Sequence, residues 1–215
     1  MAEYYNPDIG EYSAPCSFDL SAIKWSNGLL IRSTNWLGDA VMTIPAVFKL
    51  SQIKTADTPL IIVCPEKLRE LWESFEWVDR IISFTGKRLS ANEKAEIKEL
   101  NADLAIVLPN SFGSIWDLWN AGAKSIMGRT GNLRSMMLDY KMPQWKRVPG
   151  EDRLHQSSHY LEFSTSCGIS DWDLNYPVTE FAEMESPSND LKNFLVISPG
   201  AAFGPAKQWP AEHFN

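Results

Sequence analysis

The stretch that decides the fold is LLIRSTNWLGDAVMTIPAVFKL, residues 29–50. Its first three residues, 29–31, are large and aliphatic, which is typical of a strand buried on both faces. Residues 33–38 break this pattern and predict a loop, and the apolar spacing after them predicts a helix to residue 50. Pro45 is expected near the first turn of that helix or at a kink, because proline lacks the N–H that an interior turn uses. The stretch therefore predicts the opening unit of an α/β fold.

The same alternation continues along the chain to about residue 128. Short runs of aliphatic and β-branched residues follow one another, with helical patterns between them. Strands are predicted at residues 29–31, 60–64, 80–84, 103–108 and 125–127. Strands that alternate with helices favour a parallel sheet. We therefore predict a Rossmann-like α/β fold, a parallel sheet with helices on both faces.

The helices beyond the first have recognisable ends. Pro65 suits the first turn of one helix, and residues 91–100 predict a charged surface helix. Ser111 is a candidate N-cap for the next helix. The buried side of that helix is predicted to hold Ile115, Trp116, Leu118 and Trp119. A last helix is predicted from about residue 152 to residue 167, with Gly168 in the C-cap place.

These boundaries predict four regions in the chain of 215 residues. Residues 28–168 form the first Rossmann-like domain, and residues 1–27 form an N-terminal extension. Residues 169–192, rich in Asp, Glu, Ser and Pro, predict a linker. Residues 193–215 contain a strand at 194–197, a glycine-bearing loop and a helix start. We expect them to be the beginning of a second Rossmann-like domain that is truncated at its carboxyl end.

Composition and charge exclude several classes of protein. Twenty basic and 27 acidic residues give a net charge of −7, the wrong sign for a chain that coats nucleic acid. No apolar run approaches the roughly 20 residues of a membrane span, and residues 1–27 lack the features of a secretory signal. Cys16, Cys64 and Cys167 are too scattered for a disulfide framework or a structural zinc site. We expect a cytoplasmic protein with reduced thiols.

Asp39 is the candidate catalytic residue of the first loop. It lies beyond the carboxyl end of the first strand, where open α/β sheets bind their ligands, and no other residue of the loop is ionisable. Gly38 beside it permits an unusual backbone angle, and the amides at a helix N-terminus favour an ionised carboxylate. Such a carboxylate can act as a general base. The alternative is that Asp39 only caps the following helix.

Four segments carry a resemblance to a known family. They are LLIRSTNWLGDAVMTIPAV (29–47), DLAIVLPNSF (103–112), HQSSHYLEF (155–163) and SPGAAFGPAKQWP (198–210). In order and approximate spacing they resemble the ADP-heptose:lipopolysaccharide heptosyltransferases, those of type II above all. The resemblance implies the GT-B arrangement, in which two Rossmann-like domains face a cleft. This chain would hold the acceptor-side domain and the beginning of the nucleotide-sugar domain.

The resemblance also implies a reaction. An inverting transferase would move heptose from ADP-heptose to the heptosyl-Kdo-lipid A inner core of lipopolysaccharide, at the cytoplasmic face of the membrane. Asp39 would be the catalytic base, and no metal or other cofactor would take part. Lys207, which follows Gly200 and Ala201, would neutralise the departing diphosphate, unless it is an ordinary solvated lysine. The candidate substrate-binding residues are Asn35, Gly38, Asn110, Ser111 and His155.

Two positions depart from the family pattern. Members usually carry Arg or Lys where Gly113 stands and a basic residue where Gln208 stands, so this chain lacks two positive charges near the cleft. The departures predict weaker phosphate binding. For Ser111, helix capping explains the residue as well as sugar binding does.

Three weaker patterns have alternative readings. Asp171 and Asp173 form a D-x-D triplet, which holds a metal in another glycosyltransferase class but here follows a helix exit. His155 and His159 lie one helical turn apart without an evident third metal ligand, which favours a polar helix face. Residues 124–153 carry seven basic and three acidic side chains, a net +4. They offer either a docking patch for an anionic lipid or phosphorylated sugar, or a solvated loop.

Two other functions remain open from the sequence. A catalytically silent fragment would bind the acceptor but lack most of the donor site. A related transferase of the heptosyltransferase I type would use a different acceptor. A nicotinamide-binding Rossmann protein is disfavoured, because residues 32–38 offer one glycine where the G-x-G-x-x-G motif needs three.

Overall fold

The structure is a computed structural model that describes residues 14–131, 133–145, 155–177, 200, 208 and 210–213. Contacts divide the chain into two units, Met1–Glu180 and Phe181–Asn215. The second unit is described at a few positions, which include the 3-10 turn η5 (Ala211–His213). The strand predicted at 194–197 lies outside the described residues. The fold below is therefore that of the first unit.

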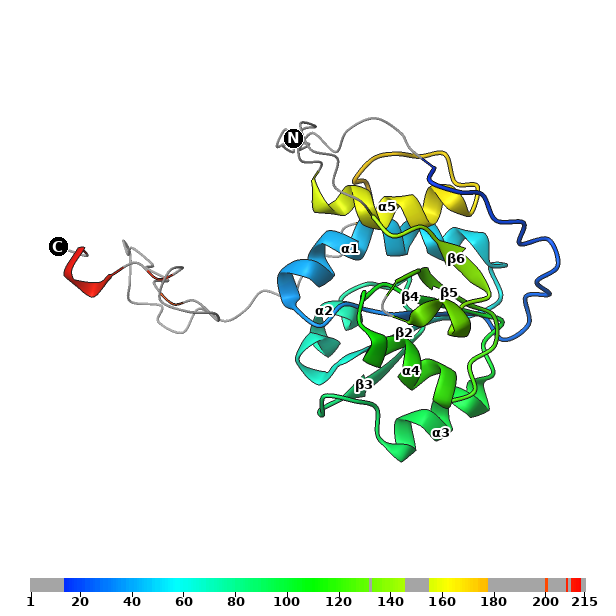
Figure 1. The fold of residues 1–215 in the computed structure, drawn as a ribbon, viewed down its shortest axis with the longest axis horizontal. Coiled ribbons are helices and arrows are strands. Elements are labelled where there is room, and N and C mark those ends of the chain that lie inside the picture. The colour runs from blue at the N-terminus through cyan, green and yellow to red at the C-terminus, as the bar shows by residue number, and fades with distance from the viewer. Residues whose placement is uncertain are drawn as a thin grey trace. The chain divides into compact units, whose positions relative to one another are not determined.

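A parallel sheet of six strands, counted over the described residues, forms the centre of this unit (Figure 1). The strands are β1 (Leu29–Arg32), β2 (Leu60–Pro65), β3 (Arg80–Phe84), β4 (Leu104–Val107), β5 (Ile126–Arg129) and β6 (Tyr140–Met142). Their order across the sheet is β3-β2-β1-β4-β5-β6, so the winding reverses between β1 and β4. The predicted Rossmann-like fold class is confirmed.

Helices cover both faces of the sheet. They are α1 (Leu37–Leu50), α2 (Arg69–Glu73), α3 (Ala91–Leu100), α4 (Phe112–Asn120) and α5 (Gln156–Ser166), with 3-10 turns η1 (Ser51–Ile53), η2 (Glu66–Leu68) and η3 (Arg134–Met137). Figure 1 shows α1 and α5 side by side over one face, and α3 and α4 over the other. Among the described residues, no helix is both long and apolar enough to cross a membrane.

Alternate residues of each strand supply two separate cores. On β1, Leu29 and Ile31 pack with residues of α1 and α5, whereas Leu30 packs with residues of α3 and α4. All three side chains are fully buried, as a parallel strand covered on both faces requires. This double burial explains why the decisive stretch begins with an unbroken aliphatic run.

A glycine and an aspartate fix the entry to β1. Gly28 has a φ of +91°, and a Cβ at this position would lie 2.1 Å from the carbonyl oxygen of Pro59, so a side chain would clash with the backbone. The Asp103 carboxylate accepts hydrogen bonds from the backbone N–H groups of Ser26, Asn27 and Gly28 at 2.6–2.8 Å. Because Asp103 directly precedes β4, it holds β1 and β4 together at their amino ends.

Segments on either side of the domain also pack onto it. In the N-terminal extension, Phe18 contacts the core, and its backbone N–H donates to the Ser166 carbonyl at 2.8 Å. Residues 169–177, at the start of the predicted linker, pack as well. Trp172 contacts the small cluster between α1 and α5, and the Tyr176 ring lies against the edge of the core. Both segments extend the cover over the α1 face of the sheet.

The structure departs from the predicted elements in three places. On α4, Ile115 and Leu118 are buried as predicted, but Trp116 and Trp119 are 38% and 50% exposed. The helix packs one narrow side on the sheet, and both tryptophans lie outside that side. Pro45 lies inside α1 and not near its first turn, so of the two predicted positions only the one at a kink stays a prediction. The strand β6 was not predicted, because a three-residue edge strand is too short to show a periodic pattern.

Candidate functional site

The candidate site lies at the carboxyl edge of the sheet, where the winding reverses between β1 and β4. All parallel strands end at this edge, and open α/β sheets bind ligands just outside it. The segment after β1 supplies Asn35, Gly38 and Asp39, and the loop after β4 supplies Asn110 and Ser111. The structure therefore brings two groups of predicted site residues, separated in sequence, to one edge.

A buried arginine orients Asn35. Arg32, the last residue of β1, donates from Nη2 to Asn35 Oδ1 at 2.7 Å and from Nη1 to the Ser33 carbonyl. Its guanidinium also lies 4.7 Å from the centre of the Phe84 ring. Burial lowers the pKa of Arg32 to about 10, so the group remains charged at neutral pH. Because the guanidinium engages Oδ1, the amide nitrogen of Asn35 is left to face a ligand.

A second buried arginine orients Asn110. Arg134 of η3 is 2% exposed and donates to Asn110 Oδ1 at 3.3 Å and to the Pro109 carbonyl at 3.1 Å. Burial is the main cause that lowers the pKa of Arg134. The Ser111 hydroxyl accepts from the Ser114 N–H at 3.2 Å, which confirms Ser111 as the N-cap of α4. A sugar contact of Ser111 or Asn110 stays a prediction.

Asp39 lies in the first turn of α1 and is partly exposed. The N-cap position of α1 belongs to Trp36, and no side chain caps this helix, so capping does not explain Asp39. Its carboxylate instead accepts a hydrogen bond from Gln156 Nε2 at 3.3 Å. The same amide nitrogen lies 3.3 Å from the Tyr160 hydroxyl. The Asp39 carboxylate thus lies at the positive end of the α1 dipole and is held from α5 by Gln156.

A buried ion pair holds α5 against the sheet. Arg129, the last residue of β5, donates to Glu162 Oε2 and, at 2.6 Å, to the His159 carbonyl. Burial opposes ionisation of Glu162, but the hydrogen bonds and charges of His159 and Arg129 outweigh it and lower its pKa. The Arg129 guanidinium donates further to the Pro143 carbonyl at 2.9 Å. Three chain segments are thus joined at one guanidinium.

His155 is the N-cap of α5. Its Nδ1 accepts from the Ser157 N–H at 3.3 Å, and the helix begins at Gln156 rather than near residue 152. At the other end Gly168 has a φ of +91° and follows the helix as predicted. His155 therefore has a structural role, and sugar binding by it stays a prediction. It is the neighbouring Gln156 that contacts Asp39.

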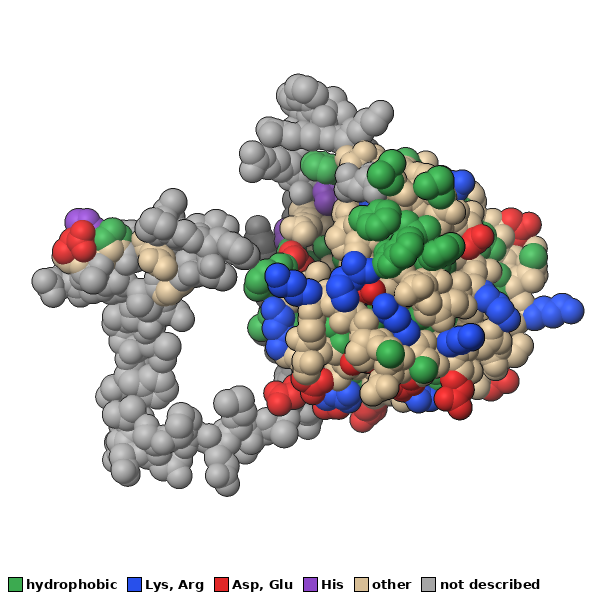
Figure 2. All heavy atoms as spheres, turned by 60° about the horizontal axis from the view of Figure 1, so that its bottom comes forward, with side chains coloured by type: hydrophobic (Ala, Val, Ile, Leu, Met, Phe, Trp, Pro, Cys, Tyr) green, Lys and Arg blue, Asp and Glu red, His purple; other side chains and the backbone are tan. Residues whose placement is uncertain are grey.

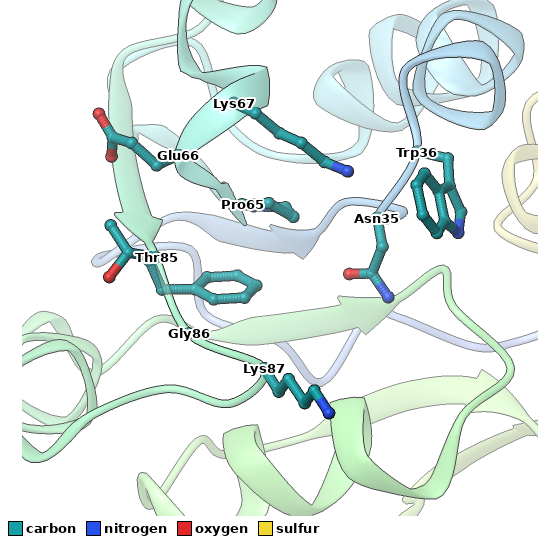
Figure 3. A pocket seen from close by; sticks show the side chains of 9 residues that line it. Asn35, Trp36, Pro65, Glu66, Lys67, Thr85, Gly86 and Lys87 are labelled. Atoms are coloured by element: carbon teal, nitrogen blue, oxygen red, sulfur yellow. The ribbon is translucent and has the colours of Figure 1, made fainter. Parts of the chain in front are cut away.

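A cavity of about 500 Å³ opens at the same edge, over the carboxyl ends of β1, β2 and β3. It is lined by Asn35, Trp36, Pro65, Glu66, Lys67, Phe84, Thr85, Gly86 and Lys87. Figure 3 shows Lys67 on one side of the space, with its ammonium turned toward Trp36, and Lys87 on the opposite side, with its ammonium directed away from Lys67. The Lys67 ammonium lies 4.1 Å from the centre of the Trp36 ring, a cation–π contact.

The cavity presents positive charge. Its one carboxylate, Glu66, points away from the space in Figure 3 and binds Arg69 at 3.4 Å and the Ser83 hydroxyl. Lys67 and Lys87 give the lining its positive charge, although the Lys67 ammonium also contacts the Trp36 ring. An anionic group, a carboxylate or a phosphate, suits this arrangement.

Two glycines of the site differ from their predicted roles. Gly38 lies inside α1 without a positive φ, so the expected unusual angle is wrong; the helix already begins at Leu37. A Cβ at Gly38 would meet nothing within 4 Å, so the position leaves open space beside Asp39. At Gly113, a Cβ would lie 3.5 Å from the guanidinium of Arg88. Arg88, which comes from another segment, therefore places a cation where the resemblance predicts a basic side chain.

The predicted donor-phosphate residues belong to the second unit. Ala201 and Lys207 lie outside the described residues. Gly200 and Gln208 are described and exposed. A diphosphate contact by these residues stays a prediction.

The weaker metal patterns have structural explanations. Asp173 of the D-x-D triplet pairs with Lys49, which is 3% exposed, at 2.9 Å. Burial opposes ionisation of Asp173, but the hydrogen bonds from Lys49 and from the Asn175 N–H lower its pKa. His159 lies against Glu162 and the Trp145 ring instead of pairing with the N-cap histidine. Over the described part of the chain, no three His, Cys, Asp or Glu side chains are close enough to hold a metal.

The described basic residues of the segment 124–153 do not form one surface patch. Lys124 precedes β5, and Arg129 ends it, so they lie at opposite edges of the sheet. Arg129 and Arg134 are 4% and 2% exposed and bind backbone carbonyls, which removes both from the surface. Of the described basic residues in the segment, Lys124 and Lys141 are exposed. The described residues therefore do not support a docking patch, and Lys146, Arg147 and Arg153 lie outside them.

Sequence reasoning missed several residues of the site. Lys67 and Lys87 follow β2 and β3, and the rule that ligands bind at carboxyl ends of strands pointed to them. Gln156 directly follows His155, the residue that the sequence had indicated for substrate binding. Thr34, two residues after the end of β1, is 5% exposed, and its hydroxyl has no hydrogen-bond partner among the described residues. A buried polar atom without a partner is a further candidate for contact with a ligand.

Residues 92–215, more than half of the chain, match the model of glycosyltransferase family 9 (heptosyltransferase). The chain belongs to glycosyltransferase family 9. The resemblance inferred from four sequence segments is confirmed at the level of the family.

Curated family 9 relatives match most of this chain. Lipooligosaccharide heptosyltransferase 2 of Haemophilus ducreyi is 25% identical over 208 residues, which cover 86% of this chain and 58% of that protein. Lipopolysaccharide heptosyltransferase 2 of Escherichia coli is 24% identical over 207 residues, with the same two coverages. The chain thus spans 58% of the length of these relatives.

Solved structures confirm the fold. ADP-heptose lps heptosyltransferase II of E. coli aligns with a TM-score of 0.60 at 24% identity, over 85% of this chain and 57% of that chain. E. coli heptosyltransferase WaaC with ADP aligns with a TM-score of 0.52 at 17% identity, over 72% of this chain and 49% of that one. At these identities the likeness establishes the Rossmann-like architecture of the family 9 chain.

Proposed function

We propose that this family 9 chain takes part in the transfer of heptose from ADP-heptose to the heptosyl-Kdo-lipid A inner core of lipopolysaccharide, with inversion at the anomeric carbon. The observation that carries the proposal is the position of Asp39. It is a partly exposed carboxylate at the N-terminus of α1, at the edge where the sheet changes its winding. The relatives named heptosyltransferase 2 support this pair of substrates.

In the proposed step, the acceptor hydroxyl oxygen attacks the anomeric carbon of the heptose and forms the new C–O bond. The bond from that carbon to the diphosphate oxygen breaks, and its electron pair leaves with ADP from the opposite face. Asp39 accepts the hydroxyl proton as the new bond forms. Gln156 donates to Oδ1 of Asp39 and thereby leaves Oδ2 for the proton.

The acceptor is proposed to occupy the cavity and the switch point beside it. Kdo is a sugar acid, and its carboxylate matches the ammonium groups of Lys67 and Lys87. The oriented amides of Asn35 and Asn110 offer hydrogen bonds to sugar hydroxyls. The open space at Gly38 admits the acceptor close to the catalytic base.

The donor is proposed to bind the second unit. Lys207, with the backbone at Gly200 and Ala201, would neutralise the leaving diphosphate. We propose that this neutralisation works without a metal or other cofactor. The reaction would take place in the cytoplasm, with peripheral contact to the inner face of the membrane where the lipid-linked acceptor is held.

Replacement of Asp39 by Asn tests the proposed base. The change keeps the side-chain shape and removes the basicity, so turnover should fall about 10²- to 10⁴-fold. The melting temperature should stay within the range of the control Asp57→Asn, which changes an exposed loop aspartate. Turnover is measured as ADP release in the full polypeptide that the gene encodes. More than about half of the parental turnover in Asp39→Asn would exclude the base assignment.

The same assays separate two alternatives. A silent acceptor-binding protein would bind lipopolysaccharide core without releasing ADP, and Lys67→Gln with Lys87→Gln would weaken that binding. A transferase of the heptosyltransferase I type would accept Kdo-lipid A that lacks the first heptose. Turnover on the heptosylated acceptor alone supports the proposed substrate.

A further inference from the structure

An aromatic ridge runs along the exposed side of α4. Phe112, Trp116 and Trp119 are 42%, 38% and 50% exposed. Their rings contact one another in series, with centres 5.9 Å and 5.4 Å apart. Three large aromatic side chains in contact form a continuous apolar surface, which soluble proteins seldom leave uncovered without a partner.

Two further apolar side chains adjoin this ridge from η3. Leu133 and Met136 are 79% and 87% exposed. The turn η3 packs beside α4, and Arg134 within it donates to the Pro109 carbonyl just before that helix. Leu133 has a φ of +62°, a conformation that a leucine rarely adopts. The chain thus holds two bulky apolar side chains outward next to the aromatic ridge.

Basic side chains border the ridge. Arg88 lies against Gly113 at the first turn of α4, and Lys98 lies against Gly122 just beyond its last turn. The one carboxylate of α4, Asp117, is 4% exposed and is paired with Arg88 at 2.8 Å and Lys94 at 3.7 Å. Figure 2 shows hydrophobic side chains gathered on this face with Lys and Arg side chains along their border. The surface therefore combines exposed aromatic rings with outward positive charge.

We propose that this surface, which we call the α4 face (Phe112, Trp116, Trp119, Leu133 and Met136), docks onto an anionic lipid bilayer. Tryptophan prefers the interface between lipid and water, and protruding leucine and methionine side chains insert into the acyl boundary. A basic border complements anionic headgroups. Arg88 and Lys98, which lie beside the two ends of α4, make anionic headgroups a better match than an uncharged protein surface.

The α4 face begins at the rim of the candidate site. Phe112 directly follows Ser111, and η3 supplies the arginine that orients Asn110. A bilayer against the α4 face would therefore lie next to the carboxyl edge of the sheet. The proposal that a bilayer binds the α4 face rests on the proposed function. A bilayer bound there would let the enzyme reach a lipid-linked acceptor without extracting it from the membrane.

Vesicle binding by the full polypeptide tests the docking surface directly. The probes are vesicles of phosphatidylcholine alone and of phosphatidylethanolamine with phosphatidylglycerol, and binding is measured by co-sedimentation. The protein should prefer the anionic vesicles, and added salt should weaken binding. The double variant Trp119→Gln/Met136→Gln should bind about tenfold more weakly or worse, the change expected for loss of about 60 Å² of buried apolar surface.

Trp145→Gln is the matched control. Trp145 is 45% exposed and contacts His159 near α5, on the opposite face of the sheet from α4. Its replacement should leave vesicle binding unchanged. Melting temperatures of both variants equal to that of the parent would show that the fold is intact.

Three outcomes would overturn the proposal. The first is that the parent binds neither kind of vesicle, and the second is that the control weakens binding as much as the double variant does. The third is that the double variant loses self-association, measured by sedimentation velocity, while its vesicle binding is unchanged. The last result would assign the α4 face to a second copy of the chain. Transfer to a lipid-free core oligosaccharide separates the two proposals, because the double variant should retain it and Asp39→Asn should lose it.

Discussion

Replacement of Arg129 by methionine isolates the buried ion pair that holds α5. The Arg129 and Glu162 side chains are 4% and 10% exposed, and the guanidinium also donates to the carbonyls of His159 and Pro143. Methionine keeps a long apolar side chain in the same space beneath α5. It removes the positive charge and every donor, so Glu162 keeps its negative charge in a buried place without its main partner.

The expected loss of stability is large. Removal of one partner from a buried ion pair costs about 3–5 kcal/mol, because the remaining charge is neither hydrated nor compensated. At neutral pH we expect the free energy of unfolding of Arg129→Met to fall by about this amount. A second change, Glu162→Met in the same chain, should recover part of the loss, since an apolar pair in this space removes the uncompensated charge.

The pH dependence of the loss distinguishes the charge from simple packing. In the parent, His159 and Arg129 lower the pKa of Glu162 against the effect of burial. The carboxylate therefore stabilises the parent above the ordinary glutamate pKa, and that contribution is lost as the pH falls through the lowered value. In Arg129→Met the lowering by Arg129 is lost while that by His159 remains, so the pKa of Glu162 should be higher than in the parent. The stability difference between variant and parent should consequently shrink as the pH is lowered, because protonation removes the buried charge.

Urea unfolding of the parent and both variants, at neutral pH and at pH values around the glutamate range, checks these expectations. A destabilisation below about 1 kcal/mol at neutral pH would show that Glu162 finds water or another partner. A loss that is the same at every pH would assign the effect to packing. A double variant less stable than Arg129→Met would contradict the idea that the unpaired carboxylate is the source of the cost.

Two further predictions concern the remainder of the domain. Asp103→Ala should lower the free energy of unfolding by about 2–4 kcal/mol, because three backbone N–H groups lose their charged acceptor; Asp103→Asn, which keeps an oxygen acceptor, should lose less in the same urea titration. Burial raises the pKa values of Cys64 and Cys167 to about 12, so iodoacetamide should label both slowly, and the fully buried Cys64 only as fast as the fold opens. Rapid labelling of Cys64 in the native protein, read by mass spectrometry, would contradict its burial.

The sheet was largely predictable because its strands are buried on both faces. Such strands appear as short aliphatic runs, and the predicted strand at residues 80–84 and helix at residues 91–100 agree with β3 and α3 to the residue. The helix boundary at Ser90 is exact for a local reason. Ser90 and Glu93 form a capping box, which depends on neighbours three residues apart rather than on tertiary contacts. Prediction succeeded where the determining forces lie within one segment.

The arginines show where such reasoning fails. From the sequence, Arg129 and Arg134 belonged to a basic surface segment, because charged residues are seldom buried. In the structure both are buried, since carbonyls and a carboxylate from other segments satisfy their donors. These partners lie up to 33 residues away in the chain. No local pattern reports them, and the same tertiary origin explains why the contact of Gln156 with Asp39 was missed.

The surroundings of Gly113 show, within the candidate site, a second tertiary contact that the sequence does not reveal. The sequence predicted a lost positive charge, because relatives usually carry a basic residue at this position. The structure places the guanidinium of Arg88, from the segment between β3 and α3, within 3.5 Å of where a side chain at position 113 would begin. Asp117 fixes that guanidinium at 2.8 Å, so the cation is held at the first turn of α4, although its charge is partly balanced. A basic residue that is missing from one position of a motif therefore does not mean that the site lacks a positive charge. On this side of the site the charge comes from Arg88, which lies beside Gly113.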